Sequence, residues 1–393
     1  MRIDVIGAGL SGLATAWFLT ERGAEVRGVD AGTRPGGLIQ TQHVPEGLVE
    51  TAARAFTWTA DADALFRALN VTPSFARDES RRRFIFRNGR PMRWPLTPIE
   101  TAGFAARVGG AWLGRRMRPR GTETVAAWGA RVLGHAATTW LLAPALQGIY
   151  ATPPAQLSAA AIFGKDRPKG GKLAAPAAGM GALMDRLHES LRERGVTFEF
   201  GAVAEPLDIG RAPTVICTNA PAAARLLAPH APRLAEALSR IRMVSLLSAH
   251  AFFAPHAGDA RGFGVLFPRT SGVHALGAVF NADVFAGRSD LRSETWIYGD
   301  IDAEALPATD EQAIHQMEAD RRMLTRRAEP PVACYIRRQP AALPVYDTSV
   351  LDAQAALPEL PPHIAIAGNY LGRLGVSHLI RGAADAAARI GRI

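Results

Sequence analysis

The chain has 393 residues, 48% of them apolar, which suits two interleaved domains with a sizeable buried core. Its formal net charge of +9 comes with scattered arginines and no finger, recognition helix or aromatic platform, so no nucleic-acid partner is expected. Every apolar run is broken before about 18 residues, which argues against a membrane span. The two distant cysteines, Cys217 and Cys334, exclude a disulfide framework, and the ten histidines form no spacing that would chelate a metal ion.

The first predicted elements are a strand, a glycine turn and a helix. Residues 2–6 are typical of a short buried strand, and an apolar helical stretch over residues 10–23 follows the turn. Within the turn, Gly7 makes the tight bend, Gly9 lets a pyrophosphate approach the backbone, and Gly12 lets helix and strand pack closely. The free amides at the helix N-terminus then face the phosphates. We expect cofactor contacts from Gly7, Gly9, Leu10, Ser11 and Gly12.

The next predicted strand, residues 24–30, ends in an acidic residue. Asp30 follows Gly7 by 23 positions and can accept hydrogen bonds from ribose hydroxyls. Strand, turn, helix, strand and acid in this order predict a dinucleotide site rather than a chance glycine turn. The same glycine spacing explains the apolar N-terminal run better than a signal peptide does, so we expect a cytoplasmic protein.

Several helices are predicted in the Ala-, Trp- and Arg-rich residues 97–160, over segments 97–117, 122–134 and 137–150. Within them AWLGRRMRPR, residues 111–120, has interfacial character, which leaves a solvated helix end and a peripheral membrane contact as alternatives. Near the C-terminus, a strand at residues 364–367 leads through a glycine-bearing turn into an Ala-rich helix that begins near Gly375.

Two of these regions carry a family resemblance. Residues 29–37, VDAGTRPGG, resemble the second nucleotide motif of glutathione-reductase-type FAD proteins, especially the amine oxidase and protoporphyrinogen oxidase group. Residues 364–390 look like the closing FAD motif of that group. The resemblance implies FAD rather than a nicotinamide, held non-covalently because the closing motif has no cysteine. The further cofactor contacts that it implies are Arg34, Gly36, Gly37, Leu38, Val203, Gly368, Asn369, Gly375 and Val376.

Further segments resemble protoporphyrinogen oxidase specifically, and they occur in the family's order. They are residues 82–96, 146–165, 179–187, 262–288 and 337–347. The resemblance implies an FAD-dependent oxidase that removes hydride from a reduced tetrapyrrole, protoporphyrinogen or coproporphyrinogen, and passes the electrons to dioxygen. Its small-molecule substrate is then flat, apolar and carboxylate-bearing.

The same resemblance implies four substrate contacts. Arg83 aligns with an arginine that pairs with a substrate carboxylate, although a solvated place in the Arg81–Arg83 run is an equal alternative. Phe263, Leu266 and Phe280 are implied to line the pocket, but apolar strand residues are more often plain core.

Lysine usage separates the branches of this family. Amine-oxidising relatives carry a lysine near the flavin, on a strand in the C-terminal half of the substrate domain. The three lysines of this chain, Lys165, Lys169 and Lys172, lie elsewhere, and the turn that contains Lys165 resembles one of the porphyrinogen branch. A monoamine or polyamine oxidase is therefore disfavoured.

One segment departs from the family pattern. Residues 49–56, VETAARAF, keep Glu50 but replace the glycine and proline that usually follow, and the FAD-domain strand meander is shortened. These departures leave open a divergent FAD-dependent oxidase or desaturase of a specialised metabolite. The FAD motifs also allow a flavin-binding protein without turnover, although the substrate-domain matches argue against it.

The predicted fold class is α/β. It combines an FAD-binding Rossmann-like domain of the glutathione-reductase type with an inserted α+β substrate domain and a helical subdomain. The FAD-binding domain takes residues 1–72, 175–228 and 360–393, the substrate-binding domain residues 73–96 and 229–359, and the helical subdomain residues 97–174. The oligomeric state does not follow from the sequence.

Overall fold

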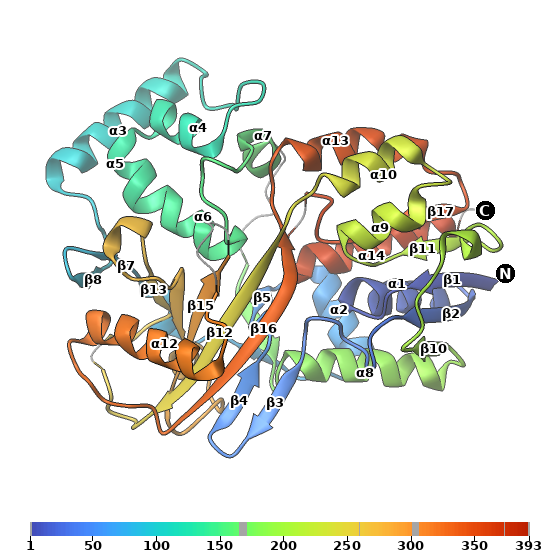
Figure 1. Ribbon diagram of the computed structural model, residues 1–393, viewed down its shortest axis with the longest axis horizontal. Coiled ribbons are helices and arrows are strands. Elements are labelled where there is room, and N and C mark those ends of the chain that lie inside the picture. The colour runs from blue at the N-terminus through green and yellow to red at the C-terminus, as the bar shows by residue number, and fades with distance from the viewer. Residues whose placement is uncertain (1, 165–170, 259, 301–305, 373, 392–393) are drawn as a thin grey trace.

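The computed structural model describes residues 2–164, 171–258, 260–300, 306–372 and 374–391 (Figure 1). Two sheets organise the molecule. A parallel sheet lies beside both termini, and a larger sheet lies toward the opposite end. Two long strands of the larger sheet, β12 (Met243–Phe253) and β16 (Ala333–Pro344), run side by side toward the parallel sheet and so connect the two halves.

The parallel sheet gathers strands from three distant parts of the chain. Its order is β10-β2-β1-β11-β17, and all four strand pairs are parallel. The predicted strands at residues 2–6, 24–30 and 364–367 are confirmed, with bounds that differ by at most one residue. The strands are β1 (Arg2–Ile6), β2 (Glu25–Asp30), β10 (Thr197–Phe200), β11 (Thr214–Ile216) and β17 (Ile364–Ile366).

Helices cover both faces of this sheet, as a buried parallel sheet requires. Alternate residues of β1 point to opposite faces, so Ile3 and Val5 join one apolar cluster and Ile6 joins the other. The first face is covered by α1 (Leu10–Thr20), α2 (Ala60–Ala68), α8 (Met180–Glu193) and α14 (Val376–Ile390). The second is covered by α9 (Ala220–Leu227), α10 (Pro232–Ser239) and α13 (Thr348–Ala356).

The first helix ends earlier than predicted. The apolar pattern predicts a helix to Gly23, whereas α1 ends at Thr20. Gly23 adopts a positive φ of 77°, its amide donates to Thr20 O, and the Ala24 amide donates to Leu19 O. This glycine turn satisfies the last carbonyls of the helix and turns the chain toward β2.

The larger sheet has the order β16-β12-β15-β14-β13-β7-β8. All neighbours are antiparallel except β13 and β7, which pair in parallel. One face packs on α12 (Asp310–Thr325), while the other looks toward the rest of the molecule. The remaining strands of this sheet are β7 (Arg83–Arg87), β8 (Arg90–Met92), β13 (Gly264–Leu266), β14 (Gly277–Phe280) and β15 (Arg292–Gly299).

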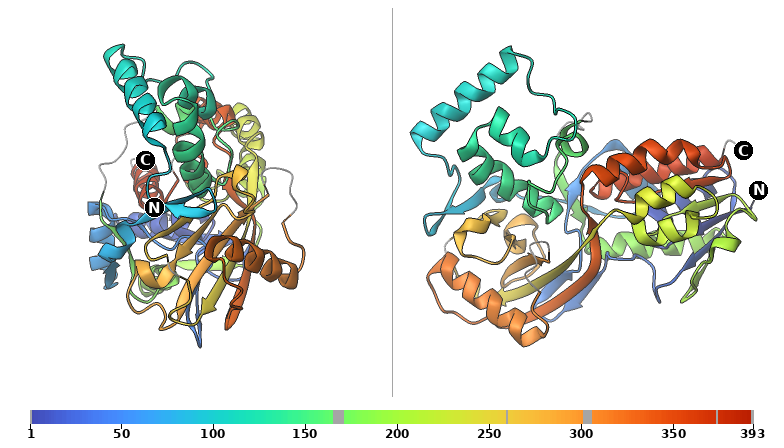
Figure 2. Two further views of the ribbon diagram at one scale, coloured as in Figure 1. Left: turned by 90° about the vertical axis from the view of Figure 1, so that its left-hand side faces the viewer. Right: turned by 45° about the horizontal axis from the view of Figure 1, so that its top comes forward.

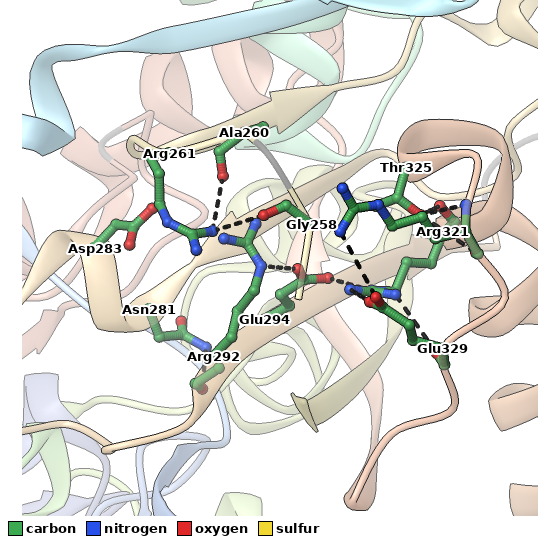
Figure 3. Close-up of polar contacts among 12 residues, drawn as sticks. Gly258, Ala260, Arg261, Asn281, Asp283, Arg292, Glu294, Arg321, Thr325 and Glu329 are labelled. Carbon is green, nitrogen blue, oxygen red and sulfur yellow. Dashed lines mark hydrogen bonds and ion pairs between the residues drawn. The ribbon is translucent and has the colours of Figure 1, made fainter. Parts of the chain in front are cut away.

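A buried charge network ties β15 to α12 (Figure 3). Glu294 has no exposed surface and accepts hydrogen bonds from Arg292 Nε at 2.5 Å and Arg321 Nε at 3.2 Å. The indole of Trp296 donates to the same carboxylate at 3.1 Å. Arg321 also lies 3.7 Å from the ring centre of Phe253. Glu294 therefore compensates the charge of Arg292 and shares that of Arg321 with Glu329, whose Oε2 lies 3.7 Å from Arg321 Nη2.

The helical region forms a separate layer above the larger sheet, and its three predicted helical segments are confirmed. α3 (Pro98–Leu113) projects away from the body (Figure 2), and Ile99, Trp112 and Leu113 on it are exposed. Among the described residues, no helix is long and apolar enough to cross a bilayer. Membrane contact by residues 111–120 stays a prediction. The other helices are α4 (Val125–Val132), α5 (His135–Ala137), α6 (Ala143–Tyr150) and α7 (Ala159–Phe163).

Short strands complete the fold between the two sheets. The hairpin of β3 (Thr41–Val44) and β4 (Gly47–Glu50) leads into residues 49–56, which depart from the family pattern and are called the departure segment below. β5 (Phe56–Thr57), β9 (Leu173–Pro176) and β6 (Pro73–Phe75) form a small antiparallel sheet. The division of the chain into three domains stays a prediction.

Candidate cofactor and substrate site

A cavity of about 780 Å³ lies where the carboxyl ends of the parallel strands meet β12 and β16. Ligands of open α/β sheets bind at this edge. One part of the wall is the predicted nucleotide machinery, from the turn after β1 to the start of α14. The other part is the open face of the larger sheet.

The turn after β1 has room only for glycine at two positions. Gly7 adopts a φ of 104°, and a β-carbon built on it would lie 2.6 Å from Cys217 O. A β-carbon at Gly12 would lie 1.7 Å from Gly7 O. Gly12 does not line the cavity, so the lack of a side chain at this position serves the packing of α1 on the turn.

Two helices begin at this cavity without a side-chain cap. Gly9 is the N-cap of α1 and Gly375 is the N-cap of α14, and neither helix has an acidic residue in its first turn. The two helices pack against each other, so their free amides and positive dipole ends open on one space. This pair of N-termini suits a pyrophosphate.

Asp30 lies at the end of β2 and lines the same cavity. Its carboxylate accepts hydrogen bonds from the amides of Ala8 at 2.5 Å and Gly32 at 2.6 Å. These bonds fix the carboxylate beside the glycine turn. Each carboxylate oxygen keeps further acceptor capacity, which a ribose hydroxyl can use.

All of the predicted cofactor contacts except Gly12 and Arg34 line the cavity. Arg34 instead donates to Pro35 O at 3.0 Å and to Gly37 O at 3.2 Å, so it braces the turn that follows Asp30. Val203 is 61% exposed at the rim. The residues brought together here are Gly7, Gly9, Leu10, Ser11, Asp30, Gly36, Gly37, Leu38, Val203, Gly368, Asn369, Gly375 and Val376.

The larger sheet supplies the wall opposite the nucleotide motifs. Ile297, Ser248 and Arg337 lie directly opposite one another on β15, β12 and β16, and all three line the cavity. The intervening residues Leu247 and Trp296 belong to the core under α12. The wall is otherwise largely apolar, with Met243, Leu246 and Leu343 from the sheet and Ile149 from α6.

Arg54, which lines the cavity, meets His250 beside this wall. Arg54 Nη2 lies 3.5 Å from His250 Nε2, and His250 Nδ1 lies 3.0 Å from Thr295 Oγ1. Burial lowers the pKa of His250 well below its usual value, and the positive charges of Arg54 and Arg337 act in the same direction. Burial also lowers the pKa of Arg54 to about 10, against the opposing charge of Glu50. His250 is therefore neutral at neutral pH while Arg54 keeps its charge.

None of the four predicted substrate contacts lines this cavity. Arg83 is exposed on β7 and stacks 4.8 Å from the ring centre of Phe263. Leu266 lies on β13, and Phe280 is 1% exposed beneath the guanidinium of Arg292. Their roles in substrate binding stay predictions.

Glu50 of the departure segment has a structural partner. Its Oε1 accepts hydrogen bonds from Arg288 Nη1 and from the Met180 amide, both at 3.0 Å, and its Oε2 accepts from Thr41 at 2.7 Å. Burial raises the pKa of Glu50, while these three groups and Arg54 oppose that rise. Glu50 therefore compensates the charge of the buried Arg288. It also accepts a hydrogen bond from the first turn of α8, whose own N-cap residue provides no side-chain cap.

Sequence reasoning missed Arg54, His250 and Arg337. The only signal for Arg54 was its place in the departure segment. Of the lysines, Lys165 and Lys169 lie outside the described residues, and Lys172 lies 5.9 Å from the ring centre of Phe75, away from the cavity wall. Cys217 is a buried thiol at the cavity, and its burial raises its pKa to about 12.

Comparisons with known proteins agree with this geometry. A family model described as an NAD(P)-binding Rossmann-like domain matches residues 5–70. Chloroplastic protoporphyrinogen oxidase from Oryza sativa subsp. japonica is 25% identical over 98% of this chain and 87% of its own length. Coproporphyrinogen III oxidase from Mycobacterium tuberculosis is 26% identical over 98% of this chain and 96% of its own.

Solved structures with low sequence identity share the fold. A putative protoporphyrinogen oxidase from Exiguobacterium sp. 255-15 superposes with a TM-score of 0.83 at 18% identity, over 100% of this chain and 98% of that one. Cyclohexylamine oxidase from Brevibacterium oxydans IH-35A superposes with a TM-score of 0.73 at 17% identity, over 100% and 98%. The predicted fold class and the protoporphyrinogen oxidase-like character of the chain are confirmed, and the chain is an oxidoreductase.

Proposed function

We propose that this chain is an oxidase that binds FAD non-covalently and dehydrogenates a porphyrinogen, protoporphyrinogen or coproporphyrinogen, with dioxygen as acceptor. The observation that carries the proposal is the single cavity that joins the nucleotide motifs to a largely apolar wall of the larger sheet. A dinucleotide and a large flat substrate can meet there with little water between them.

The residues of the cavity fit FAD in three respects. The free N-termini of α1 and α14 would hold the pyrophosphate, and Asp30 would hold the ribose. The glycines at positions 7 and 12 let the backbone and helix come close enough for those contacts. When bound, the flavin supplies an acceptor for hydride.

The chain's own contribution to the reaction is positioning. Leu246, Ile297 and Ile149 offer apolar surface to a flat ring system and exclude water from it. Each turnover would remove a hydride and a proton from the substrate. The two electrons and two protons would then pass to dioxygen, which becomes hydrogen peroxide. Repeated turnovers would convert the porphyrinogen to the aromatic porphyrin.

The proposal is tested by anaerobic mixing. The purified protein should show a yellow flavin spectrum, and protoporphyrinogen or coproporphyrinogen should bleach it without oxygen. Admission of oxygen should restore the colour and yield hydrogen peroxide and a fluorescent porphyrin. A flavin that neither substrate bleaches would overturn the porphyrinogen proposal and leave the FAD proposal standing.

The same experiment separates the two alternatives left open by the sequence. A protein whose flavin dithionite bleaches and oxygen reoxidises, but which ignores both porphyrinogens, would favour an oxidase of another metabolite. A flavin that oxygen does not reoxidise after reduction would favour a binding protein without oxidase turnover.

A further inference from the structure

We propose that Arg54 and Arg337 form an anion subsite at the substrate end of the cavity, where they take one carboxylate of the substrate. The inference rests on the proposed function for the identity of that substrate. Its chemistry concerns only the two guanidinium groups and the cavity, so it can be tested separately.

The two arginines reach the cavity from different elements. Arg337 lies on β16 directly opposite Ser248 of β12, in the row of the sheet that lines the cavity. Arg54 lies between β4 and β5, in the segment where this chain departs from the family pattern. His250 connects the two: its Nε2 lies 3.5 Å from Arg54 Nη2 and 3.5 Å from the Oγ of Ser248, the residue opposite Arg337. One end of the cavity therefore carries two cations.

In the part of the chain that the structure describes, no carboxylate lies within ion-pair distance of Arg54 or Arg337. Glu50 acts on Arg54 only from a greater distance, because its carboxylate is paired with Arg288. Arg54 Nε and Arg337 Nε are buried, and neither has a hydrogen-bond acceptor among the described residues. Among the same residues, Arg337 Nη1 donates to Ile336 O at 2.7 Å, and Arg54 makes one long contact, with His250.

Neighbouring arginines show the contrast. Arg338, the next residue of β16, is paired with Asp310 outside the cavity. Arg288 is paired with Glu50. Both side chains are half-buried, and a guanidinium nitrogen that is buried without an acceptor is costly. Both arginines line the cavity, where a ligand can supply the missing acceptor.

The chemistry of the subsite points to a carboxylate. A guanidinium group presents parallel donors that match the two oxygens of a carboxylate, and partial burial strengthens such bonds. His250 is neutral, so the site offers no third cation that a more highly charged anion would favour. Leu246 and Ile297 beside the arginines favour an apolar body attached to the acid.

The test uses 2-naphthoate as the probe and 2-naphthamide as its neutral counterpart. Calorimetry on the FAD-loaded protein should show naphthoate binding with a Kd at least roughly tenfold below that of the amide. Arg54→Met and Arg337→Met should each raise the Kd for naphthoate by roughly tenfold or more, with little effect on the amide. Arg54→Lys should restore part of the affinity.

Arg338→Met is the matched control, because it removes the same charge from the same strand on the side away from the cavity. It should leave naphthoate binding unchanged. The flavin content and the thermal melting of each variant check the fold, and the lysine variants replace any methionine variant that fails this check. Equal binding of acid and amide, no naphthoate binding, or unchanged affinity in both arginine variants would overturn the subsite.

The porphyrinogen reaction provides a second readout that separates the two proposals. Under the subsite proposal, both variants raise KM for the porphyrinogen more than they lower kcat. Arginine-dependent naphthoate binding without any porphyrinogen oxidation would sink the proposed function and leave the subsite. Porphyrinogen oxidation with unchanged KM in both variants would sink the subsite and leave the proposed function.

Discussion

Gly12 of α1 packs against Gly7 of the turn after β1, and their contact shows how single residues set the geometry of the cofactor site. The α-carbon of Gly12 faces the carbonyl oxygen of Gly7 so closely that no side chain fits between them. Burial also sets the charges of single residues at this site. It lowers the pKa of both His250 and Arg54, so that His250 is neutral at neutral pH while Arg54 keeps its charge.

Replacement of Gly12 by alanine should prevent cofactor binding. Its β-carbon would clash with the backbone of Gly7, which no side-chain movement relieves, and the strain should destabilise the protein by about 1–3 kcal/mol. The flavin-to-protein ratio after purification and the melting temperature measure both effects. Gly109→Ala in α3 is the control, because a β-carbon there meets open space, and it should raise stability by about 0.5–1 kcal/mol. A yellow Gly12→Ala protein would contradict the expectation.

Stability should fall on mild acidification because of His250. Burial depresses its folded-state pKa, so below about pH 6.5 the unfolded chain takes up a proton that the folded chain refuses. Stability from this group is thus fully present above the unfolded pKa and is lost as the pH falls. Urea unfolding between about pH 7.5 and pH 5.5 should show a loss roughly 1 kcal/mol larger for the wild type than for His250→Asn.

His315→Asn is the control for this pH dependence, since His315 is exposed on α12. It should keep the pH dependence of the wild type. The same pH dependence in His250→Asn and in the wild type would show that His250 accepts a proton in the folded state.

At the scale of elements, β12, β15 and β16 have two faces with different tasks. The register places Leu247 and Trp296 in the core under α12, while Ser248 and Ile297 face the cavity. A shift of one residue in this register would exchange the two faces, so the core under α12 also fixes which side chains reach the cavity. The buried charge network of Figure 3 secures β15 in that position.

Glu294→Gln should weaken this element strongly. The amide keeps the shape of the side chain but leaves the buried guanidinium group of Arg292 without a counter-charge and that of Arg321 with only the more distant Glu329, at a cost of roughly 3–5 kcal/mol. Equilibrium unfolding in urea measures the loss. Glu329→Gln removes the outer carboxylate of the same network, which is 38% exposed, and should cost about 1 kcal/mol or less. Equal losses in the two variants would contradict the central role of Glu294.

At the scale of the whole molecule, the cavity links parts of the chain that are far apart in sequence. Its wall takes residues from the turn at Gly7 to the helix that begins at Val376, and from the larger sheet between them. A ligand that binds only the folded arrangement therefore stabilises all of these segments together.

FAD should raise the melting temperature of the apoprotein, with a stabilisation of about 4 kcal/mol when FAD exceeds its Kd roughly a thousandfold. Riboflavin is the matched comparison, because it lacks the pyrophosphate that the N-termini of α1 and α14 attract. Thermal shift and limited proteolysis should both show a smaller effect for riboflavin. Equal effects would mean that the helix N-termini do not bind the pyrophosphate.

The sequence alone determined the nucleotide half of the site. The sequence correctly predicted the strand before Gly7, the glycine turn and helix that follow it, the strand that ends at Asp30 and the helix that begins near Gly375. Each depends on local backbone requirements that glycine spacing and apolar periodicity reveal. The exact ends of helices and strands differed, because turns outside the periodic segments decide the boundaries.

Only the tertiary structure decided the substrate half. Arg54 and His250 are 196 positions apart and become neighbours because the chain between β4 and β5 folds onto the open face of β12. Arg83, for which the resemblance implied a substrate contact and the RRR run a solvated place, lies on β7, and its side chain stacks on Phe263 outside the cavity. Strand order and register across the whole chain decide that Arg54 reaches the cavity and that Arg83 does not. No local sequence pattern around Arg54 or Arg83 encodes this placement.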